Sequence, residues 1–191
     1  MGKTFIVAFV CGMIAVASVC YAQASPLEVR KSYEQMVFDG GFRSIDDAVL
    51  TCEKHFRRNI ALPVRMPPVV FSHAFARCGI DAEYRMNDNL SIEYVGDGVT
   101  VDGKNHYMID IRPIAQKIDR FFHSRAIIGT YRLGDGTLAQ YGANGFFRTI
   151  VFEKDGWQYR LSVDRRIGDL VSAEKLVDIA NSVGWPAIGN Q

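Results

Sequence analysis

Most of the chain between residues 69 and 163 alternates between apolar and polar residues, and this alternation constrains the fold more than any other feature. After the prolines of segment 63–68, short stretches rich in β-branched and aromatic residues are separated by turn formers such as Asn87-Asp88-Asn89. A period of two is typical of strands with one covered face. We therefore expect antiparallel strands at 69–78, 81–86, 90–95, 106–111, 126–133, 137–142, 147–153 and 157–163.

Other segments repeat their apolar residues with helical spacing. Helices are predicted at about 26–38, 44–56 and 172–183, each with a serine as its N-cap. A weaker helical pattern predicts a further helix between Pro113 and Phe122.

Together these elements predict an α+β fold, in which an antiparallel β-sheet is covered on one face by helices within a single domain. An N-terminal helical segment at 25–43 precedes the α+β domain at 44–186, and a C-terminal tail at 187–191 follows it.

The N-terminus has the composition of an export signal. A single lysine precedes an uncharged apolar run at 5–21, and Ala22 and Ala24 place small residues where a signal peptidase reads them. We expect residues 1–24 to be a cleaved signal peptide, which makes the mature chain periplasmic or extracellular. The alternative is an uncleaved membrane anchor, because the run is close to the roughly 18 apolar residues that begin to suffice for a membrane span.

The mature chain is expected to carry no net charge. The full chain has 22 lysines and arginines against 21 aspartates and glutamates, and the signal segment holds one of the lysines. A neutral chain without a basic run has no electrostatic reason to bind nucleic acid or an anionic membrane. We expect no nucleic-acid partner, and membrane contact only through residues 1–24 if they are not cleaved.

Two cysteines, Cys52 and Cys78, remain once the signal segment is removed. In an oxidising compartment a lone pair of cysteines most often forms a disulfide. Closing a loop of this length stabilises a fold by about 3 kcal/mol in the chain-entropy model. The alternative is a pair of buried free thiols. A catalytic thiolate is disfavoured, because Cys52 lies on the apolar stripe of the predicted helix at 44–56.

The stretch FEKDGWQYRLSVD, at 152–164, predicts a hairpin with aromatic strands. In its second strand alternate residues share a face: the apolar row is Trp157, Tyr159, Leu161 and Val163, and the polar row is Gln158, Arg160 and Ser162. We interpret the apolar row as core that is covered by the final helix. The alternative is a carbohydrate or peptide platform built on Trp157, with Tyr159 beside it.

Four stretches occur in an order that resembles a known family: SIDDA at 44–48, NIALPVRMPP at 59–68, FRTIVFEKDGWQYRLSVD at 147–164 and SAEKLVDIANSV at 172–183. The chain resembles a bacterial domain of unknown function found in exported proteins and in the extracytoplasmic parts of anti-sigma regulators. That domain is distantly similar to lipoprotein-carrier folds. The resemblance covers residues 44–183, with a departure at 96–144, and it implies an exported domain without carrying over an anti-sigma role.

The sequence contains no local motif for metal, phosphate or cofactor chemistry. The histidines, His55, His73, His106 and His123, lack the HxH and HxxxH spacings, and there is no CxxC or nucleophile elbow. The acidic stretch at 97–102 lacks the regular oxygen ligands of a calcium loop. We therefore expect no cofactor and no metal, and we name no catalytic residue.

These features predict an exported, non-catalytic binding or sensing module of the bacterial cell envelope. Its partner is expected to be an envelope protein or a small apolar ligand. One alternative is a carrier that holds an apolar or lipid ligand in a cavity between sheet and helices. A second alternative is a hydrolase with unidentified carboxylates, because an acid and a base can be far apart in sequence.

Overall fold

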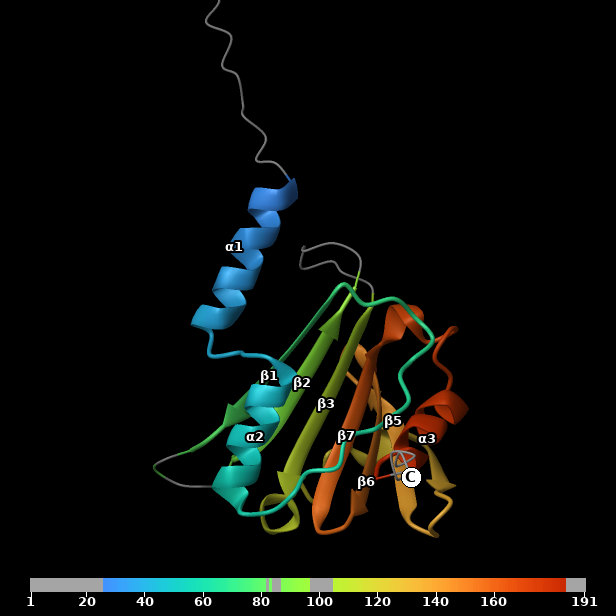
Figure 1. The fold of residues 1–191 in the computed structure, drawn as a ribbon. Coiled ribbons are helices and arrows are strands. Elements are labelled where there is room, and N and C mark those ends of the chain that lie inside the picture. Colours follow the sequence, from blue (N-terminus) through green and yellow to red (C-terminus); the bar gives the residue numbers. More distant parts are fainter. Residues whose placement is uncertain (1–25, 82, 84–86, 97–104, 185–191) are drawn as a thin grey trace, which may run out of the picture.

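The computed structural model describes residues 26–81, 83, 87–96 and 105–184, and within them the chain forms seven strands and three α-helices (Figure 1). Several sequence predictions fall outside the described residues: the signal segment 1–24 with Ala22 and Ala24, most of the strand at 81–86, the acidic stretch at 97–102 and the tail at 187–191.

The seven strands make one antiparallel sheet of two meanders. The first consists of β1 (His73–Gly79), β2 (Asn89–Val95) and β3 (His106–Pro113), and the second of β4 (Ile127–Arg132), β5 (Leu138–Asn144), β6 (Phe147–Lys154) and β7 (Trp157–Asp164). The order across the sheet is β1-β2-β3-β7-β6-β5-β4, so the last strand in the chain joins the two meanders at the centre. The α+β class and the antiparallel pairing are confirmed.

The helices contact separate parts of the sheet. α2 (Ile45–Phe56) packs on β1 and β2, and α3 (Ala173–Asn181) packs on β6. Segment 57–72 runs between them, across β7 and β3 (Figure 1). α1 (Pro26–Asp39) projects away from the sheet, and its Tyr33 ring lies 6.0 Å from the ring of His73 on β1.

The helix predicted between Pro113 and Phe122 is wrong. A single turn of 3-10 helix, Ile114–Gln116, is followed by extended chain at Lys117. The reason is a tertiary contact: the Gln158 side chain of β7 accepts a hydrogen bond from the Ile118 amide at 2.9 Å and donates one to the Ile118 carbonyl at 3.1 Å. Both backbone groups of Ile118 are therefore satisfied without a helix.

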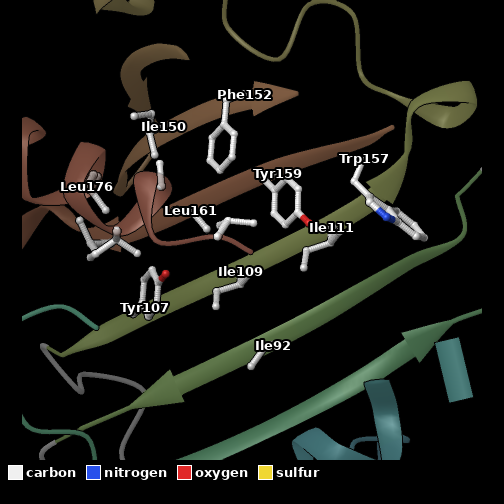
Figure 2. Close-up of a cluster of buried hydrophobic side chains, with 14 of the residues drawn as sticks. Ile92, Tyr107, Ile109, Ile111, Ile150, Phe152, Trp157, Tyr159, Leu161 and Leu176 are labelled. Atoms are coloured by element: carbon white, nitrogen blue, oxygen red, sulfur yellow. The ribbon is translucent and has the colours of Figure 1, made fainter. Parts of the chain in front are cut away.

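The core lies along the apolar row of β7 and the residues opposite it on β3 and β6 (Figure 2). The largest fully buried side chains include Leu90, Ile92, Tyr107, Ile109, Ile111, Ile150, Phe152, Tyr159, Leu161 and Leu176. The polar row is largely buried as well, since Gln158 and Ser162 are 3% and 7% exposed. Both faces of β7 are thus largely covered, whereas the alternation predicted cover on one, because Ile118 and Phe121 lie against its polar side.

Candidate functional site

Cys52 of α2 and Cys78 of β1 form a disulfide with a Cα–Cα distance of 5.4 Å, which confirms the predicted pairing. The bond ties α2 to the edge of the sheet, and Cys52 is fully buried. Because disulfides persist in oxidising compartments, this bond is consistent with an exported protein. The two cysteines act as scaffold.

Both aromatic residues singled out in the sequence lie in the core. Trp157 is 2% exposed, its ring centroid lies 5.2 Å from that of Phe56, and its indole N–H donates to the Asn59 carbonyl at 3.2 Å. The Tyr159 hydroxyl donates to the Ala61 carbonyl at 3.0 Å. Neither ring is available as an exposed ligand platform.

The expected cover of Trp157 by the final helix is wrong. The residues over Trp157 come from the end of α2 and the segment after it, since the chain crosses the start of β7 there. Leu176 of α3 lies beside Ile150 at the other end of the core, far along the sheet from Trp157 (Figure 2).

Three of the histidines lie beside carboxylates, and the fourth faces solvent. The Nε2 atoms of His55, His106 and His73 lie 2.7, 3.3 and 3.6 Å from carboxylate oxygens of Asp88, Glu93 and Glu34 respectively, and His123 is exposed. Among the described residues, no three His, Cys, Asp or Glu side chains are grouped so that they could hold a metal ion.

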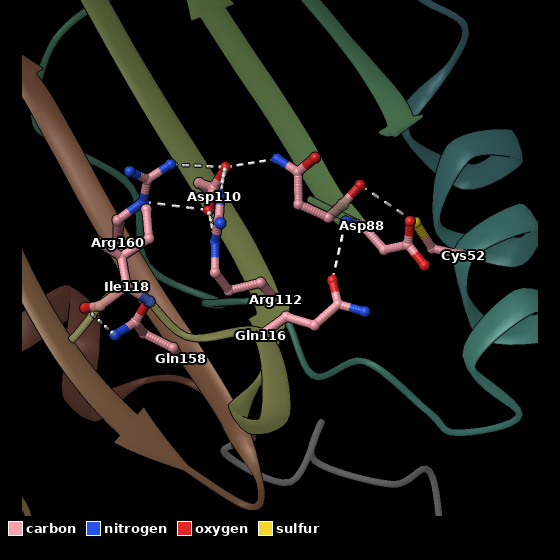
Figure 3. A network of polar contacts seen from close by, with 9 residues as sticks. Cys52, Asp88, Asp110, Arg112, Gln116, Ile118, Gln158 and Arg160 are labelled. Atoms are coloured by element: carbon pink, nitrogen blue, oxygen red, sulfur yellow. Dashed lines mark hydrogen bonds and ion pairs between the residues drawn. The ribbon is translucent and has the colours of Figure 1, made fainter. Parts of the chain in front are cut away.

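A cluster of charges lies on the polar side of β3 and β7, and we call Asp110, Arg112 and Arg160 the arginine cluster (Figure 3). Asp110 lies opposite Arg160 in the β3–β7 register. The Nε atoms of Arg112 and Arg160 each lie 3.1 Å from Oδ1 of Asp110, and Nη2 of Arg160 lies 2.8 Å from Oδ2. The three side chains are 13%, 8% and 18% exposed, so the cluster is largely desolvated.

The Asp110 carboxylate is fully occupied by donors. Arg112 and Arg160 each approach it through Nε and Nη2, and Nδ2 of Asn89 lies 2.5 Å from Oδ2. A carboxylate has about four lone-pair sites. These five contacts leave Asp110 no lone pair for another donor, while two guanidinium groups share its single negative charge.

A cavity of about 170 Å³ opens beside the arginine cluster. Its floor carries the Thr149 and Ser162 hydroxyls, whose oxygen atoms lie 2.9 Å apart and are buried. Arg160, Asp110, Ser91 and Asn144 complete the polar lining. The other residues around it are Met108, Phe121 and Phe147. The cavity therefore combines a polar floor with mainly apolar walls.

Phe121, on one side of the cavity, is positioned by the two hydrogen bonds between the Gln158 side chain and the Ile118 backbone, which we call the Gln158 clamp. The clamp holds the extended chain against β7, and Phe121, three residues further on, places its ring over the Arg160 guanidinium, with a distance of 4.8 Å from Cζ to the ring centroid. Such a cation–π contact fixes the guanidinium plane while leaving its edge free for hydrogen bonds.

The carboxylates with clearly shifted pKa values lie outside this cavity. Burial raises the pKa of Asp88, but hydrogen bonds from His55 and from the Asp81 amide outweigh it and lower the pKa overall. Hydrogen bonds from Thr137, assisted by Lys154, lower the pKa of Asp135 to about 2. These groups are held ionised, which is the opposite of a general acid poised near neutral pH.

Part of this site could be predicted from the sequence. Alternation placed Gln158, Arg160 and Ser162 on one face of β7, and the same rule places Asp110 and Arg112 on one face of β3. The pairing of β3 with β7 joins residues 50 positions apart, and no local pattern in the sequence specifies it.

Comparison with known proteins found no matching family model, no matching curated protein and no matching solved structure. No helix among the described residues is long and apolar enough to cross a membrane.

Proposed function

We propose that this chain is an exported, non-catalytic binding module of the bacterial cell envelope, periplasmic or extracellular, and that it binds its partner through the polar side of β3 and β7. The arginine cluster is the observation that carries the proposal. Two guanidinium groups and one carboxylate leave an excess positive charge in a largely desolvated place. Burial of two guanidinium groups that share one carboxylate leaves a net positive charge, which is costly, so the arrangement is better explained by a partner that supplies a second negative charge than by fold stability.

The acidic groups around the cluster have partners of their own. Asp88, drawn in the same network in Figure 3, accepts hydrogen bonds from His55 and from the Asp81 amide, both at 2.7 Å. Glu93 lies beside His106, and Asp164 is paired with Arg166 at 2.7 Å. Lys117 and Glu153 pair with each other at 3.0 Å. The cavity next to Arg160 is where an external group can reach the cluster.

The export part of the proposal rests on the predicted signal segment and on the disulfide, which suits an oxidising compartment. The resemblance of the sequence to extracytoplasmic domains of anti-sigma regulators agrees with a binding role in the envelope. The carrier alternative has less support, because Trp157 and Tyr159 are packed against segment 57–72 rather than lining an open space. For the hydrolase alternative, no pair of carboxylates among the described residues is assigned as acid and base.

Site-specific photo-crosslinking in the exporting cell tests the proposal. A photoreactive phenylalanine at Asn144, an exposed residue at the cavity, should give a discrete adduct, and Arg160→Gln should abolish it. The matched control is the same probe at Leu50, which is 50% exposed on α2. An adduct from Leu50 and none from Asn144 would place binding elsewhere, and no adduct from either position would contradict a binding role.

A further inference from the structure

We infer that the 170 Å³ cavity beside the arginine cluster binds a carboxylate group attached to a short apolar group. This inference rests on the proposed function and specifies its ligand. It follows from three properties of the cavity: the hydrogen-bonding groups left unused, the size, and the chemistry of the walls.

The unused polar groups at the cavity include several donors. Arg160 directs Nε and Nη2 at Asp110, and among the described residues Nη1 has no acceptor. Thr149 and Ser162 share one hydrogen bond, which engages only one of their two hydroxyl protons. The Ser91 hydroxyl also has no partner among the described residues. The floor therefore offers several uncommitted N–H and O–H groups.

The one carboxylate at the cavity cannot serve a cationic ligand. All lone pairs of Asp110 are already occupied by Asn89 and the two arginines. A cation would meet the excess positive charge of the cluster and find only neutral hydroxyl and amide oxygens as acceptors, whereas an anion would gain both an opposite charge and donors. The ligand chemistry that fits is an acceptor-rich anion.

The size of the cavity and its apolar side chains limit which anions fit it. A volume of about 170 Å³ corresponds to about six water molecules at about 30 Å³ each, which suits a group of a few heavy atoms. Phe121 and Phe147 flank the floor, and Met108 adds a third apolar wall. A sulfate or phosphate ion would leave these walls in contact with water, while a short alkyl group beside the carboxylate would cover them.

Two sources can present such a group: a free short-chain acid, or the C-terminal carboxylate of a peptide that ends in a small residue. Two probes separate them. Butyrate represents the free acid, and N-acetylalanine represents the peptide terminus. N-acetylalanine amide is the neutral control with nearly the same shape, and sodium sulfate tests for binding of any anion.

The test is a titration of the mature protein with each probe, followed by NMR chemical shifts of residues around the cavity. Saturable binding of butyrate or of N-acetylalanine is expected, with the amide at least about tenfold weaker than the acid. Arg160→Gln should abolish binding, and Arg132→Gln, which changes an exposed arginine of β4, should leave it unchanged. Equal binding of acid and amide, or of sulfate and carboxylate, would overturn the inference.

A second variant protects the test against misfolding of Arg160→Gln. Thr149→Val combined with Ser162→Ala removes the floor hydroxyls with little change in shape, and should weaken carboxylate binding severalfold while the melting temperature shows a folded protein. Unchanged affinity in this variant would contradict the assigned floor. If no carboxylate binds while the Asn144 crosslink persists, the ligand inference fails and the binding role stands; if the crosslink is also absent, both fail.

Discussion

Truncation of Trp157 tests how the core is assembled. The indole is 2% exposed, packs edge-on against Phe56 and donates a hydrogen bond to the Asn59 carbonyl. The Arg58 guanidinium lies 5.5 Å from its ring centroid. Trp157→Ala should therefore lower the free energy of unfolding by about 3–5 kcal/mol, the range for large aromatic truncations in cores.

The same geometry predicts which neighbour is coupled to Trp157. An edge-to-face aromatic pair contributes about 0.5–1.5 kcal/mol beyond its buried area. The double mutant Trp157→Ala with Phe56→Ala should depart from additivity by that amount. Leu176 is equally buried but lies beside Ile150, away from Trp157 (Figure 2). Leu176→Ala should therefore combine additively with Trp157→Ala, within about 0.5 kcal/mol.

Urea titrations of the single and double mutants measure both quantities. Sucrose in all samples keeps the double mutants folded at low urea, because it strengthens burial of the protein surface. Equal coupling of Trp157 to Phe56 and to Leu176, or a Trp157→Ala loss below about 1 kcal/mol, would refute the assignment of Trp157 to the core under segment 57–72.

Four further outcomes are expected. Thiol titration of denatured, unreduced mature protein should find no free thiol, because the disulfide is intact; two thiols would contradict it. Tyr107→Phe should raise the urea midpoint, with a gain of about 1 kcal/mol, since the buried Tyr107 hydroxyl has no partner among the described residues. The folded-state pKa of Asp88 is lowered, so the ionised carboxylate stabilises the fold fully above the unfolded pKa of about 3.9. This stabilisation is lost as the pH falls through the folded-state pKa. Asp88→Asn should therefore flatten the dependence of the unfolding free energy on pH below about 4. Gln158→Leu should increase hydrogen exchange at 117–122, and unchanged exchange would show that the clamp does not hold this segment.

Local chemistry made much of the sheet predictable from the sequence. The Asp155-Gly156 turn has positive φ at both residues, 47° and 72°, which is the two-residue hairpin connection that this dipeptide favours. The alternation in β7 assigned its apolar and polar rows correctly, and the export argument paired Cys52 with Cys78. Each of these predictions depends on neighbours in the chain or on a count of residues.

The candidate site was less predictable because it depends on contacts between distant segments. Ile118 and Phe121 have helical spacing, but hydrogen bonds to the Gln158 side chain, 40 residues later, hold that stretch extended. The arginine cluster likewise requires β7 to insert beside β3, which places Arg160 opposite Asp110. Sequence periodicity shows which residues share a face, but it does not show which strands pair.

The two rows of β7 separate stability from binding on a single strand. Trp157 and Tyr159 point into the core, while Gln158 and Arg160 point to the polar side, so neighbouring substitutions act on different properties. A change in the apolar row should lower stability, and any loss of binding should follow from unfolding. Arg160→Gln removes one partner of Asp110, which keeps its contacts with Arg112 and Asn89. Binding should therefore fall more than the free energy of unfolding does. If the arginine cluster were only scaffold, Arg160→Gln would lower stability and leave the binding of the folded fraction unchanged.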